Sequence, residues 1–448
     1  IKIDNKNLLR LYGIIELSIA ASALISFHSL PFFQNQYVEF IDLSGSAQLT
    51  VNLLRFILIF TILITPTILM GATLPVISQI VAGETQNAGK KVGFLYSLNT
   101  FGAITGVAFA GFFSILHFGI SVSFYIAAFI NILIGLIFLL KSRNQKQSRT
   151  EHKSQKENYS HAPDENTTGK IGLLLLIYSL SGFSTMALEV VWNRALVFFV
   201  GSSTYAFSII LIAFLTGISV GSLLMSILIN KIKRPVFTAA LLEFAMGIAT
   251  LFSAYMIYHY STSIFYTDAA SDPIFLSSLN SGIHQIFIVS FLVCLIPTLI
   301  MGALFPVISI IVLNKDVKTG AGVGNIYSAN TLGTIAGSLA AGFVLIPLLG
   351  VTKSIFLICL IIFILSVCLL LLNSNTKKFS YYFGLSSLLV IVLFQILLPH
   401  SLRFKSDTET KTDKLLFYKE DETATVAVFE DSRGFRSMSI NGMMIGGN

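Results

Sequence analysis

Three carboxylates fall within apolar stretches that are long enough to cross a membrane: Glu16, Glu189 and Glu243. An ionised carboxylate inside a bilayer is energetically expensive, and such residues usually serve a function, for example holding a cation. Three acids of this kind would suit a cationic substrate. We therefore take Glu16, Glu189 and Glu243 as candidate substrate-binding residues.

A structural reading competes with this one at Glu189. The residue precedes Trp192 and Arg194 by three and five positions, near the expected outer interface of the membrane. An ion pair between Glu189 and Arg194, beside a tryptophan anchored at the interface, needs no substrate. Both readings stay open from the sequence alone.

Further polar candidates lie in a segment that the chain spells twice. The pattern Tyr-Ser-x-Asn-Thr-x-Gly-x3-Gly begins at Tyr96 and again at Tyr327. A buried amide costs several kcal/mol unless it is hydrogen-bonded. Asn99 and Asn330 of this pattern therefore either bond a neighbouring helix or face a polar cavity. We add both asparagines and both tyrosines to the candidate cavity.

Composition indicates which elements must position these residues. Hydrophobic residues make up 54% of the chain and charged residues 11%, against about 25% charged in a soluble domain. The chain is therefore expected to be an all-α polytopic membrane protein, because about 20 apolar residues in a helix cross the hydrocarbon core. Eleven transmembrane helices are predicted, near residues 8–27, 52–82, 92–117, 120–140, 171–191, 203–229, 236–259, 285–313, 322–348, 354–373 and 379–398.

The net charge of +7 is carried by connections and tails, and it does not point to nucleic acid. The connections 28–51 and 260–284 contain acidic residues but no Lys or Arg, as expected of the outer face. The three cysteines show no spacing typical of a metal site, and none is predicted. Basic residues occupy the alternate connections, which are therefore expected to be cytoplasmic: Lys90 and Lys91, the stretch 141–170, Lys231–Arg234, Lys315 with Lys318, and Lys377 with Lys378.

An internal duplication organises the chain. MGATLPVIS at residues 70–78 returns as MGALFPVIS at 301–309, and residues 93–119 match 324–350 at 13 of 27 positions. Further upstream, Glu16 in LYGIIELSIA pairs with Glu243 in AALLEFAMGI. Residues 171–373 then form a complete unit of six helices, whereas the first unit has only four, so two helices are expected to be missing at its start. The units read as parallel repeats of the major facilitator type. The predicted organisation is a first repeat (1–140), a charged linker (141–170), a second repeat (171–373), an additional helix (374–400) and a β segment (401–448).

The duplicated helices carry prolines and glycines at matched positions. Each proline removes a backbone donor, so the helix is either discontinuous and lines a cavity, or is a kinked packing helix. The glycine pairs are GxxxG motifs that let another helix approach closely. The residues concerned are Pro66, Pro75, Pro297 and Pro306, and the pairs Gly102 with Gly106 and Gly333 with Gly337.

The last part of the chain changes character. After Lys414 the residues alternate in polarity, with Thr425, Ala427 and Phe429 on one face, which predicts a strand. Residues 431–434 read as a hairpin turn and 437–440 as the returning strand.

The segment SGFSTMALEVVWNRALVFFVGSSTYAFSIILIAFLTGISVGS (181–222), together with the two duplicated motifs, resembles the membrane portion of bacterial fused major facilitator/spermidine synthase proteins. This resemblance implies a multi-pass protein of the bacterial inner membrane with a role in polyamine biosynthesis. It implies that a synthase-like domain begins near residue 401, with its catalytic residues expected beyond Asn448. Such domains transfer an aminopropyl group from decarboxylated S-adenosylmethionine to putrescine; no cofactor is expected within this chain.

Three functions remain open. The membrane region could handle or transport a polyamine such as putrescine or spermidine, transport another small solute, or act only as a scaffold for the soluble domain. A transporter should place the candidate residues around a polar cavity, and a scaffold should bond them to neighbouring helices. An eleventh span would also leave the tail outside the cytoplasm, where decarboxylated S-adenosylmethionine is not expected. Either the last segment does not span, or the domain is not an ordinary synthase; the oligomeric state is not indicated.

Overall fold

The computed structural model covers the transmembrane region and the C-terminal strands. Most of the predicted linker 141–170, together with Lys315 and Lys318, lies outside the described residues. The structure describes residues 5–44, 48–82, 88–144, 168–200, 204–264, 275–313, 319–372, 377–398, 414–421, 424–441 and 443–447.

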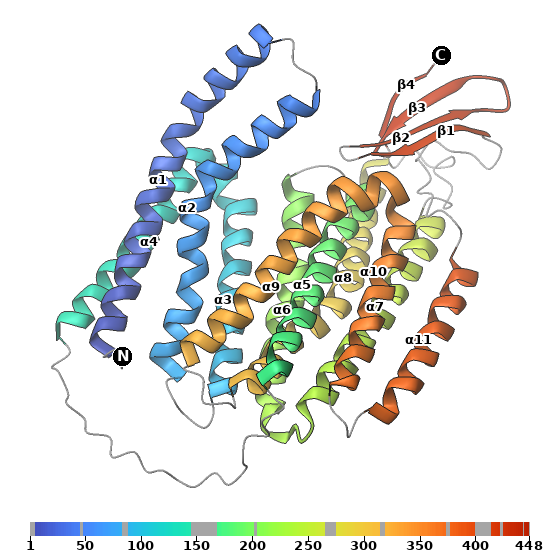
Figure 1. Cartoon of the computed structure of the whole chain (residues 1–448). Helices are drawn as coiled ribbons and strands as arrows, with labels where there is room; N and C mark the ends of the chain where they lie inside the picture. Colours follow the sequence, from blue (N-terminus) through green and yellow to red (C-terminus); the bar gives the residue numbers. More distant parts are fainter. Residues whose placement is uncertain are drawn as a thin grey trace.

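Long helices dominate the fold (Figure 1). Among the described residues, nine stretches are long and apolar enough to cross a membrane, which is the construction of a multi-pass helical membrane protein. The helices are α1 (Asn5–Ser44), α2 (Gln48–Ala82), α3 (Ala88–Phe109), α4 (Ile115–Asn144), α5 (Thr168–Val200), α6 (Thr204–Leu228), α7 (Pro235–Ile264), α8 (Phe275–Leu313), α9 (Thr319–Ala340), α10 (Ile346–Leu371) and α11 (Lys377–Leu397).

Two of the nine stretches, Ala88–Asn144 and Thr319–Leu371, are 57 and 53 residues long and are broken by a glycine. Gly119 has φ 75° and ψ 175°, and Gly350 has φ 75° and ψ 173°. Residues with a Cβ rarely adopt this conformation, so only glycine turns the chain here without strain. Each long stretch is therefore two helices that meet at a glycine.

The duplication in the sequence recurs in the backbone. A five-residue π-helical segment precedes each glycine break, at Ala110–Ser114 and again at Ala341–Leu345. Helix α3 and its π segment recur in α9 at the same offset of 231 residues. Helix α1 packs on α2 and α4, and α7 packs in the same way on α8 and α10. The duplicated sequence thus folds twice into the same four-helix arrangement.

The prolines do not interrupt their helices. Helix α2 continues through Pro66 and Pro75, and α8 continues through Pro297 and Pro306. Of the two alternatives, a helix interrupted at these prolines is not observed, and the kinked packing helix stays a prediction. The backbone breaks instead at the glycines described above, where φ is positive.

The predicted outer connections are shorter than expected. Helix α1 extends to Ser44 and α7 to Ile264, so much of 28–51 is helical. Falling hydropathy marks where the hydrocarbon ends, whereas a helix ends only where its hydrogen bonding is interrupted. The prediction ended these helices where the apolar residues end, whereas both helices continue further along the chain.

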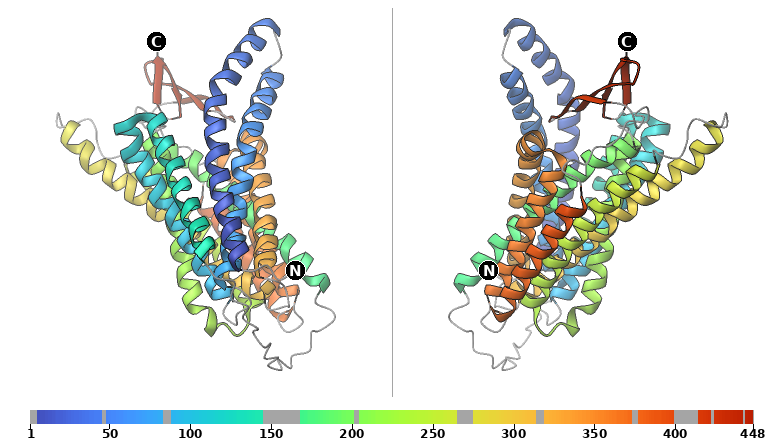
Figure 2. Two further views of the ribbon diagram at one scale, coloured as in Figure 1. Left: turned by 90° about the vertical axis from the view of Figure 1, so that its left-hand side faces the viewer. Right: turned by 90° about the vertical axis from the view of Figure 1, so that its right-hand side faces the viewer.

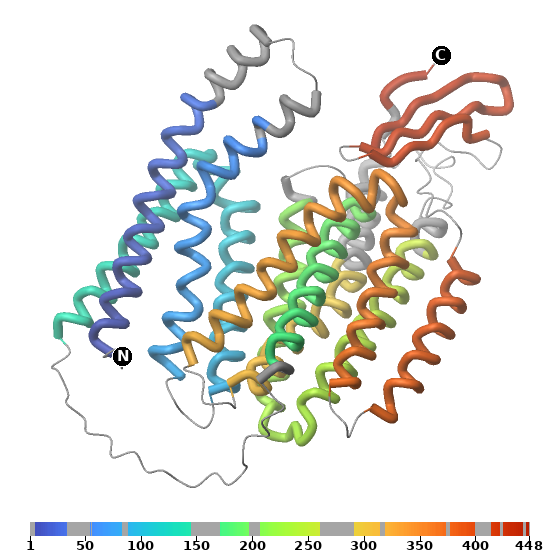
Figure 3. The backbone as a smooth tube through the Cα atoms, viewed as in Figure 1, coloured from blue at the N-terminus to red at the C-terminus, as the bar shows by residue number. Residues whose placement is uncertain are grey.

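Two helices of the second unit have no counterpart in the first. Helix α5 packs on α9 and α6 packs on α8 (Figure 3). The equivalent helices α3 and α2 have no such partners within their own unit among the described residues. The first unit is thus a four-helix version of a six-helix arrangement.

The two units meet through α3, which packs on α6 and α8, and through α2, which packs on α9. The hydroxyl of Ser97 donates to the carbonyl of Ser219 at 2.8 Å, and the hydroxyl of Ser219 donates to the carbonyl of Ser97 at 3.0 Å. These reciprocal bonds hold α3 against α6 where both helices are apolar, and they satisfy both buried hydroxyls.

A four-stranded antiparallel sheet of order β1-β2-β3-β4 follows the helices. Thr425, Ala427 and Phe429 are buried on one face, and Gly434 has φ 85° in the turn. The predicted hairpin is therefore confirmed. Figure 2 shows the sheet at the end of the bundle opposite to the N-terminus. Its strands are β1 (Lys414–Glu420), β2 (Thr425–Glu430), β3 (Arg436–Ile440) and β4 (Met443–Gly447).

Candidate functional site

Glu243 is the most deeply buried of the three candidate acids. It lies on α7 and only 1% of its surface is exposed. The hydroxyl of Ser181 on α5 is close enough to interact with it. Neither carboxylate oxygen, however, has a hydrogen-bond partner of good geometry among the described residues. A buried polar group without a partner is rare in native proteins and calls for an explanation.

Tyr178 lies near this carboxylate and links it to two further tyrosines on other helices. Tyr178 of α5 is within electrostatic reach of Glu243, of Tyr96 on α3 and of Tyr327 on α9. The ring of Tyr96 also stacks on Phe305 of α8, with 4.2 Å between ring centroids. Because α3 belongs to the first unit and the other helices to the second, the cluster lies where the two units meet. We call Glu243, Tyr96, Tyr178 and Tyr327 the central cluster.

The chemistry of the central cluster suits an organic cation. A buried carboxylate gains most from a partner with positive charge, and the faces of tyrosine rings attract ammonium groups. Glu243 and Tyr178 are buried, whereas Tyr96 and Tyr327 are partly exposed.

The other repeat-derived candidates are not brought to this cluster. The carboxyl of Glu16 is close enough to interact with the hydroxyl of Tyr12 on its own helix. Asn330 lies against the backbone of α5, where a side chain at Gly182 would collide with it. Asn99 is exposed and has no hydrogen bond to a described residue. Asn330 thus contacts a neighbouring helix and Asn99 is exposed, and which of the two readings holds for each asparagine stays a prediction.

The expected ion pair between Glu189 and Arg194 is absent. Glu189 is half-buried and lies near Cys294 of α8. The guanidinium of Arg194 instead donates to the backbone carbonyl of Asp421 at 2.6 Å. Trp192 is only 1% exposed, so it is a core residue and not an interfacial anchor. The sequence could not foresee this arrangement, because the sheet that engages Arg194 is more than 200 residues away along the chain.

Tyr178 was not among the residues singled out from the sequence. The duplication pointed to Tyr96 and Tyr327 because each occurs in a repeated motif. Helix α5 has no counterpart in the first unit, so none of its residues could be recognised by repetition. Tyr178 could have been singled out only as a tyrosine that follows a run of apolar residues, in LLLLIYSLSG.

Strand β1 docks on the helical region through its last residues. The carboxylate of Glu420 accepts a hydrogen bond from the backbone N–H of Val351 at 2.6 Å, and the hydroxyl of Tyr418 donates to its other oxygen. Val351 follows the break at Gly350, so its N–H lies at the start of a new helix and is free to be capped. Glu420 thus acts as a cap supplied by a different part of the chain.

Replacing Glu420 by alanine is expected to release β1 from the end of α10. Hydrogen bonds to charged groups contribute about 1.5–3 kcal/mol, so amide hydrogen exchange of residues 414–420 should become about tenfold or more faster. Hydrogen exchange measured by mass spectrometry on the full chain would show this. Glu430→Ala removes a carboxylate that pairs with Arg436 within the sheet and should leave β1 protected. Unchanged exchange in the Glu420 variant would mean that other contacts hold the sheet.

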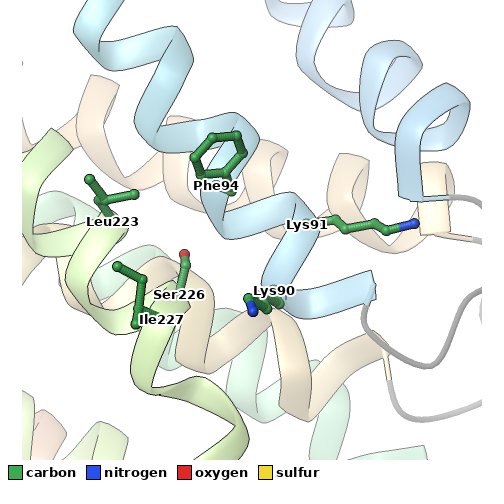
Figure 4. Close-up of a pocket in the computed structure, with 6 residues that line it drawn as sticks. All are labelled: Lys90, Lys91, Phe94, Leu223, Ser226 and Ile227. Atoms are coloured by element: carbon green, nitrogen blue, oxygen red, sulfur yellow. The ribbon is translucent and has the colours of Figure 1, made fainter.

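One cavity of about 320 Å³ lies elsewhere, at the ends of α3 and α6 beside the basic connections (Figure 4). Its walls are mainly apolar, with Phe94, Leu223 and Ile227 among them. Lys91 donates to the carbonyl of Val81 at 3.3 Å. None of the candidate residues from the sequence lines this cavity.

Within the part of the chain that the structure describes, no group of three His, Cys, Asp or Glu side chains could hold a metal ion. Comparisons with models of protein families, with curated proteins and with solved structures find no match for this chain.

Proposed function

We propose that this chain is the membrane region of a spermidine synthase-like fusion protein, and that its central cluster binds a polyamine such as putrescine or spermidine. The observation that carries the proposal is the buried carboxylate of Glu243, which has no hydrogen-bond partner of good geometry among the described residues and lies near Tyr178, itself a neighbour of Tyr96 and Tyr327. An ammonium group would supply the missing partner. The motifs that resemble the fusion family supply the reason to choose a polyamine among organic cations.

The proposed architecture is that of a major facilitator-like bundle in the bacterial inner membrane. Nine stretches of the described residues could span a membrane, and two of them are divided by the breaks at Gly119 and Gly350. Counting the two parts of each divided stretch separately gives eleven spans. The equal packing of α1–α4 and α7–α10 supports parallel repeats, between which such transporters bind their substrates. The central cluster lies at this junction.

The side of the membrane on which the sheet lies determines which substrates a synthase domain there could meet. The described basic residues between helices lie at one end of the bundle and the sheet lies at the other (Figure 1): Lys90 and Lys91, Lys231–Arg234, and Lys377 with Lys378. With the basic end in the cytoplasm, the sheet faces outward. A synthase domain in that place would not meet cytoplasmic decarboxylated S-adenosylmethionine, so in this proposal either the last helix does not span the membrane or the domain is not an ordinary synthase.

Binding of radiolabelled putrescine and spermidine to the purified chain in proteoliposomes would test the proposal. The variant Glu243→Gln keeps the side-chain shape but removes the charge, and binding should weaken at least tenfold because one buried ion pair is lost. Glu16→Gln is the matched control, since Glu16 is the repeat-related acid outside the central cluster. Equal binding by the parent chain and Glu243→Gln would remove this carboxylate from the site.

A scaffold function is the second candidate, and the contact between β1 and the bundle favours it. Glu420 and Asp421 engage α10 and α5 directly, so the helices hold the sheet in a defined position. In this case the parent chain would bind no polyamine, whereas Glu420→Ala would still free the sheet.

A further inference from the structure

The cavity of about 320 Å³ lies between α3 of the first unit and α6 of the second (Figure 4). Its volume falls within the range of small-molecule sites, about 300–1,000 Å³. The two helices touch beside it: a side chain at Gly93 would overlap the hydroxyl of Ser226, and the hydroxyl of Ser222 donates to the carbonyl of Gly93 at 3.0 Å. The cavity thus lies beside a fixed contact between the two units.

The walls of the cavity are apolar and accessible. Phe94 is 47% exposed and Ile227 is 59% exposed, and the partly buried Leu223 also lines the cavity. Ser226 adds a hydroxyl, but this group donates to the carbonyl of Ser222 at 2.7 Å, so its hydrogen is already engaged. The walls therefore suit a hydrocarbon chain.

Lys90 places a positive charge at the cavity. Figure 4 shows it on the side of Ser226 and Ile227, whereas Lys91 is turned away from them. The amine of Lys91 donates instead to the carbonyl of Val81 at 3.3 Å. No ion pair joins Lys90 to a described residue. Of the two lysines, Lys90 is therefore the one available to a ligand.

Further basic residues lie close to this end of the cavity. The segment Ile229–Lys231, which follows α6, contacts α3. Residues 83–91 and 229–235 together hold five basic residues and one acidic residue, Glu84. This end of the two helices therefore carries net positive charge, and by the positive-inside rule it is expected on the cytoplasmic side.

The change from charged to apolar residues follows the depth of the membrane. Lys90 lies in the first turn of α3, and Phe94 lies about 6 Å further along the helix, at 1.5 Å per residue. On α6, Leu223 lies roughly 12 Å deeper than Lys231. A phospholipid has the same order, with a phosphate at the surface and acyl chains below it. A free anion would use only the charge, and an apolar solute would use only the walls.

We propose that this cavity binds an anionic phospholipid of the cytoplasmic leaflet, with its phosphate at Lys90 and an acyl chain against Phe94, Leu223 and Ile227. Basic pockets between transmembrane helices on this side of a membrane bind anionic headgroups, which supports the choice. Because α3 and α6 belong to different units, the bound lipid touches both and stabilises their contact. The inference does not depend on polyamine binding, which is assigned to the central cluster.

Thermal unfolding of the full chain in a mild uncharged detergent would test the proposal. The probes are phosphatidylglycerol, phosphatidylcholine with the same acyl chains, and inorganic phosphate. A ligand that binds the folded state raises the melting temperature. Phosphatidylglycerol should therefore raise it most, and inorganic phosphate alone should leave it unchanged. Native mass spectrometry of the same samples measures the affinity for each lipid.

Two pairs of variants locate the site. Lys90→Gln should weaken phosphatidylglycerol binding about fivefold, as expected for one basic residue near an anionic headgroup. Lys377→Gln makes the same change at an exposed residue of the same end, on α11, and should not weaken it. Ile227→Ser should weaken binding of the lipid, whereas Leu224→Ser should not, because Leu224 is similarly exposed on α6 but does not line the cavity.

Three results would overturn the proposal. Equal stabilisation by phosphatidylglycerol and phosphatidylcholine would mean that the charge of the headgroup is not recognised. Stabilisation by inorganic phosphate as large as that by phosphatidylglycerol would make the cavity a site for a soluble anion. Equal losses of affinity in Lys90→Gln and Lys377→Gln would mean that the basic end of the bundle attracts the lipid without a defined site.

Discussion

Gly333→Leu is expected to prevent correct packing of the second unit, whereas Gly102→Leu should leave the chain as stable as the parent. The two glycines are equivalent in sequence. A side chain at Gly333 would overlap the backbone carbonyl of Ser179, and backbone cannot move aside as a flexible side chain can. Gly102 has no atom near its built side chain. Overpacking of this kind costs about 1–3 kcal/mol or more.

The measurement is the fraction of protein that remains monodisperse in detergent after heating. The melting temperature should fall strongly for Gly333→Leu, or the variant should fail to accumulate. Gly102→Leu provides the matched comparison, because it makes the same chemical change in the same motif. Equal melting temperatures for the two variants would show that α5 does not lie against α9 as closely as described.

This comparison also shows what the sequence could and could not predict about the fold. The motifs at Gly102 and Gly333 both indicate a helix face with small residues, which another helix can approach closely. They do not say whether a partner is present, since that depends on α5, which lies in a different part of the chain. Repetition therefore predicted the two four-helix arrangements but could not predict that only one would be covered.

The helix breaks give a second example. Interruption at proline was one of two alternatives, beside a kinked packing helix, because proline removes a hydrogen bond and clashes with the preceding turn. The membrane helices contain Pro66 and Pro297 without interruption. The conformations at Gly119 and Gly350 have positive φ, and composition does not distinguish such a glycine from one that serves packing. The duplication placed both glycines at the ends of matching segments, but their backbone role required the structure.

The central cluster was predictable in part. Three of its four members, Glu243, Tyr96 and Tyr327, were visible as an intramembrane acid and two repeated tyrosines. Their proximity was not, because α3, α7 and α9 are separated by long stretches of chain and meet only through the packing of the two units. Repetition also suggested that Glu16 would join Glu243, yet equivalent positions in two repeats belong to different halves of the bundle.

Glu243→Leu is expected to stabilise the protein while abolishing polyamine binding. The carboxylate is buried and has no hydrogen-bond partner of good geometry, and leaving such a group unsatisfied costs about 1–3 kcal/mol or more. Leucine has a similar volume and no polar atom, so the apolar neighbours of α7 should accept it. The melting temperature in detergent should therefore rise, and binding of radiolabelled spermidine should disappear.

The repeat-related acid provides the control for this reasoning. Glu16→Leu removes a carboxyl that interacts with the hydroxyl of Tyr12 and whose oxygens are not among the buried ones without a partner in the described residues, so the melting temperature should fall. The melting temperature should rise in Glu243→Leu and fall in Glu16→Leu if Glu243 is kept for a ligand at a cost in stability, as residues of functional sites often are. A loss of stability in Glu243→Leu as large as that in Glu16→Leu would mean that Glu243 stabilises the packed bundle, and the scaffold function would then be favoured over the binding of a cation.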